Sequence, residues 1–99
     1  MSSLPLSAAQ LDVALRALPA WAQRTDALER TYTFPDFMTA LAFMQDAAPE
    51  IERLNHHPEW TNVYNRVTVR LTTHDAGNRI TSADVELAKL LDWIELRFV

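Results

Sequence analysis

The sequence predicts an α+β fold in which a four-stranded antiparallel sheet carries three helices on one face. Segments with apolar residues at helical spacing alternate with segments whose apolar residues recur at every second position. Their order is αββαββα, and two hairpins in such an order favour an antiparallel sheet with its helices stacked on one face. Because 99 residues leave room for one domain, residues 1–99 are expected to form a single unit.

The first helix is predicted over Ala8 to Leu18. Ser7 and Gln10 have the spacing of a capping box, and apolar residues follow at helical intervals. Pro19 ends this helix because the residue before a proline avoids the helical conformation.

The strands are predicted as two hairpins. Residues Ala27 to Phe34 alternate aromatic and β-branched residues with polar ones, as a strand does. The preceding segment, Trp21 to Arg24, is ambiguous, although Thr25-Asp26 could turn it back onto that strand. The second hairpin is expected to join Glu59–Val63, through a tight turn at Tyr64-Asn65-Arg66, to a strand that starts at Val67 and ends at Thr73-His74-Asp75.

The second helix carries the strongest helical signal. It is expected to start at Pro35-Asp36 and to stop near Asn55 to His57, ahead of Pro58. Its apolar stripe keeps phase across Pro49, which predicts one kinked helix rather than two. The stripe comprises Phe37, Ala40, Leu41, Met44, Ala47, Ala48, Ile51 and Leu54.

The third helix is predicted to start after Thr81. Thr81 is the expected cap, with Asp84 at the third helical position, and Ile80 can pack onto Val85 as a hydrophobic staple. An apolar stripe then continues to Phe98. The loop before this helix contains the chain's single glycine.

Five side chains carry expectations about the interior of the protein. Arg30 lies on the apolar side of its strand and is expected at the rim, with its stem buried and its head in water. Met38 and Met44 are interpreted as core filling. Trp93, like Trp21, has no signal beyond core packing or an interface.

Composition narrows the possible functions. The chain has no cysteine, one glycine and a formal net charge of −4. The lack of cysteine excludes disulfides, thiolate zinc sites and a thiol nucleophile, and a single glycine excludes a glycine-rich phosphate loop. The acidic balance argues against direct nucleic-acid binding, since modules that bind the phosphate backbone carry a basic excess.

The sequence also argues against a membrane or export segment. No stretch reaches the ~18 apolar residues of a membrane helix. Met1 to Gln10 lacks the basic start and the long apolar run of a signal peptide. We therefore expect a cytoplasmic protein with no membrane partner.

The histidines are the candidates for chemistry. His56 and His57 end the predicted second helix and His74 ends the last predicted strand, and sites are often built where rigid elements end. Histidine also suits proton transfer near neutral pH. Glu52 lies one helical turn before His56, so the two side chains can meet. Trp60 could supply an aromatic wall.

Each of these residues also has a purely structural interpretation. Adjacent histidines are often polar residues at a frayed helix end, and His74 alone suits a turn. Asp84 can be a helix cap and Trp60 a strand residue packed on a helix. A zinc site of three histidines is disfavoured because His56 and His57, as neighbours, point in different directions.

Three segments together resemble the pterin-4a-carbinolamine dehydratase family, which includes the dimerisation cofactor of a homeodomain transcription factor. They are E-x-x-x-H-H-P-x-W from Glu52 to Trp60, Y-N-x-V from Tyr64 to Val67, and T-H at Thr73-His74. The resemblance implies the αββαββα fold. It also implies dehydration of 4a-hydroxytetrahydropterin to quinonoid dihydropterin, without a metal or an organic cofactor, in support of tetrahydrobiopterin recycling.

The resemblance also implies residue roles. His56 and His74 would protonate the departing hydroxyl, and His57 would contact the pterin and assist proton movement at N5. Glu52 and Asp84 would orient the imidazoles, and Trp60 would bound the ring. The residues expected to bind the substrate are Glu52, Asn55, Pro58, Trp60, Thr73, Asp75, Ala76 and Asp84.

Two departures from the family pattern stand out. The loop over Gly77 to Ile80 is one residue longer than in many relatives, which bears on where Asp84 lies, and Pro49 interrupts the helix that carries the site.

The resemblance further implies a homodimer or homotetramer and a functional link to an aromatic amino acid hydroxylase. Two alternatives stay open: a binding, assembly or transcriptional-cofactor role on the same fold, and a role in molybdopterin metabolism.

Overall fold

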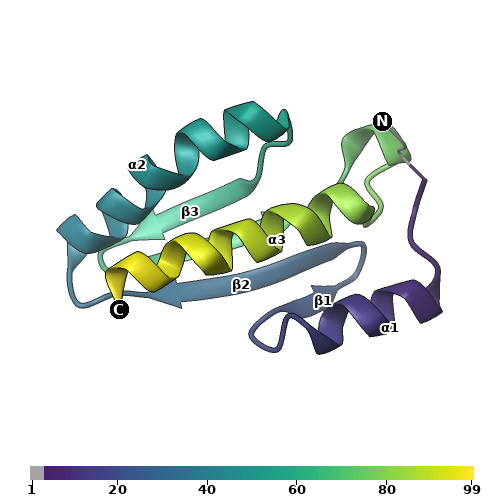
Figure 1. The fold of residues 1–99 in the computed structure, drawn as a ribbon, viewed down its shortest axis with the longest axis horizontal. Helices are drawn as coiled ribbons and strands as arrows, with labels where there is room; N and C mark the ends of the chain where they lie inside the picture. The colour runs from purple at the N-terminus through teal and green to yellow at the C-terminus, as the bar shows by residue number, and fades with distance from the viewer. Residues whose placement is uncertain (1–3) are drawn as a thin grey trace.

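The computed structural model describes residues 4–99. Met1 to Ser3, which belong to the predicted domain and to the segment compared with a signal peptide, lie outside the described residues. Figure 1 shows the order of the elements. The helices and strands are α1 (Ala8–Arg16), β1 (Ala22–Arg24), β2 (Ala27–Thr33), α2 (Phe37–Leu54), β3 (Glu59–Val63), β4 (Arg66–Leu71) and α3 (Ser82–Glu95). Two short 3₁₀ helices, η1 (His74–Ala76) and η2 (Leu96–Phe98), flank α3.

The strands form one antiparallel sheet in the order β1-β2-β4-β3. The ambiguous segment after α1 is β1, which pairs with β2 through the predicted turn at Thr25-Asp26. Thr25 adopts a left-handed backbone with φ 56° in this turn. The central pair places Tyr32 opposite Val67 and Leu28 opposite Leu71. Figure 1 shows α2 and α3 lying along the strands of the sheet, and the predicted fold class is confirmed.

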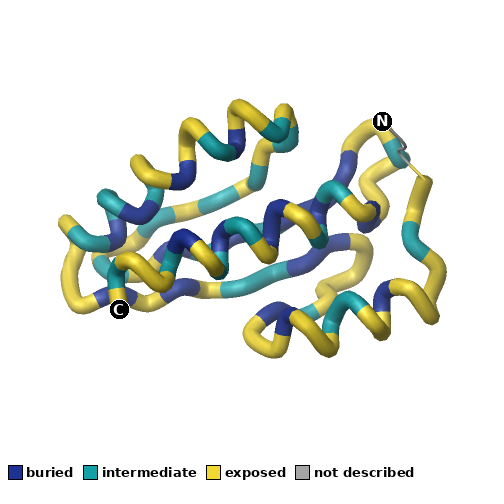
Figure 2. Tube along the Cα trace, in the orientation of Figure 1, coloured by how far each residue is buried: buried dark blue, intermediate teal, exposed yellow. Residues whose placement is uncertain are grey.

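The core lies between the helices and one face of the sheet. Leu28, Tyr32, Val67, Val69 and Leu71 alternate along β2 and β4 and are fully buried. Figure 2 shows buried positions recurring along α2 and α3 between exposed ones. The other sheet face stays polar. Within residues 4–99, none of the helices combines the length and apolar character that crossing a bilayer requires.

Both predicted capping boxes are present. The Ser7 hydroxyl accepts from Gln10 N–H while the Gln10 side chain accepts from Ser7 N–H, and Thr81 and Asp84 form the second box. Helix α1 ends at Arg16, two residues before the predicted Leu18. The cause is a tightened last turn, in which Leu18 N–H donates to the Leu15 carbonyl.

Helix α2 runs unbroken through Pro49, as predicted. Asp36 caps its start, with its carboxylate accepting from Thr39 N–H at 2.8 Å. Asn55 ends it in the left-handed conformation, with φ 52° and ψ 41°. This left-handed residue turns the chain out of the helix immediately before His56, which matters for the site.

The expectation that Met38 fills the core is wrong, because its side chain is 69% exposed. The buried residues of α2 are Ala40, Phe43, Ala47 and Ile51. Successive helical residues are rotated by about 100°, so Met38, two positions before Ala40, projects from the opposite side. Phe43, absent from the predicted stripe, instead packs on Tyr32 with ring centroids 4.8 Å apart.

The expected position of Arg30 is also corrected. Its guanidinium is not free in water but pairs with Asp92 at 2.6 Å and with Glu95 at 3.1 Å. Asp92 also accepts hydrogen bonds from Tyr32 Oη and Trp21 Nε1. Burial, followed by the hydrogen bond to Asp92, raises the pKa of the Tyr32 phenol far above its ordinary value. Trp93, by contrast, is 61% exposed and is not a core residue.

Candidate active site

All three histidines line one hollow of about 300 Å³. It lies where the turn after α2 meets the segment after β4, so two parts of the chain that are distant in sequence form its walls. The lining residues are Asn55, His56, His57, Pro58, Glu59, Thr72, Thr73, His74 and Asp75. The fold therefore brings together the two histidine segments that the sequence singled out.

His56 is anchored by a buried carboxylate. Its Nε2 lies 2.6 Å from Asp84 Oδ1, and Asp84 is fully buried. The other oxygen, Oδ2, accepts from the Thr73 hydroxyl at 2.8 Å and from Thr81 N–H at 2.9 Å. Because a carboxylate oxygen accepts hydrogen bonds, Asp84 Oδ1 is assigned as the acceptor and His56 Nε2 as the donor. Asp84 is thus both the helix cap and the partner of a site histidine.

His57 pairs with Glu52. Its Nε2 lies 2.5 Å from Glu52 Oε1, and both side chains are exposed. The sequence suggested that Glu52 would meet His56 at helical spacing, and this is corrected here. The helix ends at Leu54, and the left-handed Asn55 removes the periodicity that would have stacked His56 on Glu52.

His74 lies at the start of η1 rather than at the end of a strand, because β4 already ends at Leu71. Its Nδ1 lies 2.6 Å from the Asn78 side-chain oxygen. Sequence reasoning missed Asn78 as a site residue. The longer loop marked its neighbourhood, but nothing in the local pattern indicated a contact with His74.

The remaining predicted site residues divide between two hollows. Asn55, Pro58, Thr73 and Asp75 line the main one, whereas Ala76 is not among its lining residues. A second hollow of about 200 Å³ lies on the other side of His57 and Pro58, and its walls are Ala48, Ile51, Glu52, His57, Pro58 and Trp60. Trp60 also packs half-buried against the core, as its structural interpretation expected.

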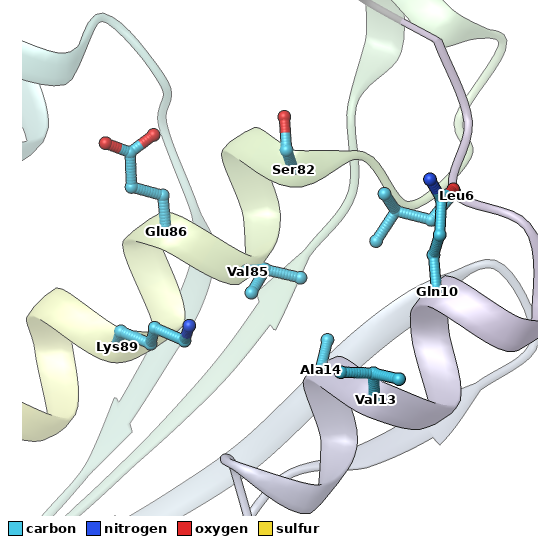
Figure 3. Close-up of a pocket in the computed structure, with 8 residues that line it drawn as sticks. All are labelled: Leu6, Gln10, Val13, Ala14, Ser82, Val85, Glu86 and Lys89. Atoms are coloured by element: carbon cyan, nitrogen blue, oxygen red, sulfur yellow. The ribbon is translucent and has the colours of Figure 1, made fainter.

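A larger groove of about 380 Å³ runs between α1 and α3, away from the histidines. Val13, Ala14 and Val85 form much of its wall. In Figure 3, Val85 reaches toward α1, whereas Glu86 points away from it. None of the histidines lines this groove, so the smaller polar hollow is the better candidate for catalysis.

Each imidazole uses one ring nitrogen to hold a protein acceptor. This arrangement leaves Nδ1 of His56, Nδ1 of His57 and Nε2 of His74 to exchange protons with a bound molecule. In residues 4–99, no three or more histidine or acidic side chains are grouped in a way that could hold a metal ion. Three imidazoles around one hollow are chemically capable of general acid–base chemistry on a small molecule.

The comparisons with known proteins agree with this class. Residues 4–94 match the family described as pterin 4 alpha carbinolamine dehydratase. A protein of Opitutus terrae named "Putative pterin-4-alpha-carbinolamine dehydratase" is 55% identical over 90% of this chain and 92% of its own. One with the same name from Solibacter usitatus is 52% identical over 88% and 90%.

A solved structure matches as well. The crystal structure of a transcriptional coactivator/pterin dehydratase from Brucella melitensis superposes with a TM-score of 0.86 at 42% identity, covering 91% of this chain and 97% of that one. The chain belongs to the pterin-4-alpha-carbinolamine dehydratase family of hydro-lyases.

Proposed function

We propose that this protein dehydrates 4a-hydroxytetrahydropterin to quinonoid dihydropterin and water by histidine acid–base catalysis. The observation that carries the proposal is the convergence of His56, His57 and His74 on one hollow. Family membership supplies the substrate class. In this role the protein would support tetrahydrobiopterin recycling after an aromatic amino acid hydroxylase reaction.

The reaction needs protons to move but no change of oxidation state. The C4a–O bond breaks as the hydroxyl oxygen gains a proton and leaves as water. N5 loses its proton, and the electron pair of that N–H bond forms the C4a=N5 double bond. One proton is therefore taken up and one is released. Groups that can both donate and accept near neutral pH suit both steps.

The proposed roles follow from the family motif and the ring environments. His56 and His74 act as the acids toward the departing hydroxyl, His56 through Nδ1 and His74 through Nε2. His57 assists removal of the N5 proton through Nδ1. The contact of His57 Nε2 with Glu52 holds the ring in place and fixes the position of its Nε2 proton. Asp84 does the same for His56 from a buried position.

The substrate contacts are proposed for the residues around these rings. Asn55, Pro58, Thr73 and Asp75 border the main hollow, and Ala76 follows in the same turn. The hollow beyond His57, bordered by Trp60 and Glu52, is open to a part of the substrate that projects past the imidazole.

The test is stopped-flow absorbance of chemically generated 4a-hydroxytetrahydropterin, with and without purified protein. We expect clear acceleration, and a loss of roughly 100-fold or more when His56 or His74 is replaced by alanine. Lys89→Ala is the matched control because Lys89 borders the larger groove between α1 and α3, and it should retain full activity. If the folded wild-type protein gives no acceleration, the proposed activity is wrong.

We also propose a cytoplasmic homodimer or homotetramer. Several large apolar side chains stay exposed at the start of α2, near the end of α3 and in the residues after it: Met38, Trp93, Leu96 and Val99. Burying such residues against a second copy would enlarge the modest core of a 99-residue chain. Light scattering should show at least a dimer at micromolar concentration, and a strictly monomeric sample would contradict this.

A further inference from the structure

Backbone hydrogen bonds to one residue, Thr73, close the loop after β4. Its N–H donates to the Arg79 carbonyl at 3.0 Å, and its own carbonyl accepts from Asn78 N–H at 3.1 Å. Gly77 and Asn78 adopt left-handed conformations in succession, with φ 73° and 60°. These contacts hold the Asn78 backbone in place, and its side-chain oxygen lies 2.6 Å from His74 Nδ1.

An amide oxygen only accepts hydrogen bonds. The contact therefore requires the proton of a neutral His74 to lie on Nδ1 and leaves the lone pair on Nε2. We propose that Asn78 is a positioning residue that fixes the tautomer and ring orientation of His74, with Nε2 as the nitrogen that exchanges protons. Its importance for turnover rests on the proposed function of His74 in dehydration.

The three histidines differ in the kind of partner and in the ring nitrogen that contacts it. His56 and His57 bind carboxylates through Nε2, whereas His74 binds a neutral amide through Nδ1. When His74 is protonated on both nitrogens, the bond from Nδ1–H to Asn78 persists. His74 can thus give up the Nε2 proton and regain it without turning its ring, so no reorganisation accompanies the transfer.

The residue type at position 78 meets two requirements at once. The backbone is left-handed, a conformation that asparagine and glycine tolerate better than most residues. The side chain must also reach back and accept from Nδ1. Glycine satisfies only the first requirement, and aspartate can satisfy both. The pair Asn78→Gly and Asn78→Asp therefore separates loss of the acceptor from disturbance of the backbone.

The test is nitrogen-15 NMR of the histidine rings in uniformly labelled protein, at a pH where the rings are neutral. In the wild type, His74 should be protonated on Nδ1. In Asn78→Gly, its signals should shift toward the Nε2–H form, while those of His56 and His57 stay unchanged as internal controls. Asn78→Asp should retain the Nδ1–H form. A wild-type His74 protonated on Nε2 would overturn the proposal.

Stopped-flow turnover of the same variants supplies a second readout. We expect kcat of Asn78→Gly to fall about fivefold, which corresponds to the loss of one ordinary hydrogen bond. The kcat of Asn78→Asp should stay close to that of the wild type. Unchanged ring signals and unchanged kcat in a folded Asn78→Gly would likewise reject the inference. If the NMR results hold but the wild type has no dehydratase activity, the proposed function fails while the anchoring of His74 stands.

Discussion

His56 Nε2 and Asp84 Oδ1 are joined at 2.6 Å across 28 positions of the sequence. The same carboxylate caps α3 through Thr81 N–H and accepts from the Thr73 hydroxyl. One buried side chain thus holds the start of a helix, the segment that follows β4 and a histidine of the candidate site. Its removal should therefore affect stability and activity together.

We expect Asp84→Ala to lower the free energy of unfolding by about 3 kcal/mol, because it leaves buried donors without their charged acceptor. Asp84→Asn should cost less stability, since an amide oxygen can still accept from Thr73 or Thr81. Turnover should nevertheless fall by tenfold or more, because an amide N–H facing His56 Nε2 favours the opposite tautomer. Urea unfolding and stopped-flow assays measure the two effects.

Glu86→Gln is the matched control for Asp84, since Glu86 is an exposed carboxylate near the same helix start. It should change neither stability nor turnover appreciably. Full activity in Asp84→Asn would show that the contact with His56 is only structural.

His57→Ala should separate activity from stability. The His57 side chain is 58% exposed and its partner Glu52 is more exposed still, so unfolding free energy should change by less than about 0.5 kcal/mol. Turnover should fall by about 100-fold if the ring moves the N5 proton. Urea denaturation and stopped-flow turnover check this, and a folded His57→Ala protein with full activity would reject the proposed role.

Tyr32→Phe probes the network on α3 that lies away from the histidines. The phenol donates to Asp92 at 2.5 Å and is buried, and a hydrogen bond to a charged acceptor contributes about 1.5–3 kcal/mol. We expect a loss of about 1.5 kcal/mol, because Arg30 and Trp21 still satisfy Asp92. Dehydratase activity should be unchanged. Denaturant unfolding at pH 7 measures the stability loss, and an unchanged midpoint would contradict it.

Asp36 should make stability depend on acid pH. Hydrogen bonds from the Thr39 hydroxyl and then from its N–H lower the pKa of the Asp36 carboxyl in the folded protein. A lowered pKa gives stability that is fully present above the unfolded value of about 3.9 and is lost as the pH falls through the folded value. Asp36→Ala should therefore lower Tm at pH 7.

The control for this prediction is Asp36→Asn, which keeps a capping oxygen but does not titrate. The Tm advantage of the wild type over Asp36→Asn should shrink between pH 4.5 and about 2.5. All other acids are common to both proteins, so their effects cancel in the difference. A gap that stays constant over this range would exclude the Asp36 contribution.

Much of the fold is readable from local sequence. Ser7 with Gln10 and Thr81 with Asp84 mark helix starts because a capping box involves residues only three apart. Strands β2 and β4 follow from period-two alternation, whereas β1 lies in a segment that the sequence left ambiguous. Errors arise where orientation depends on packing, as with Met38, which local hydrophobicity cannot distinguish from the buried Phe43.

The sequence by itself determined the order of the elements, the capping residues and the residue types available for proton transfer, since each depends on neighbours a few positions apart. Only the tertiary structure decided which acceptor each histidine has: Asp84 for His56, Glu52 for His57 and Asn78 for His74. These pairings depend on where α2 stops, how the loop after β4 closes and how α3 packs on the sheet. They are outcomes of packing and backbone geometry that no local spacing encodes.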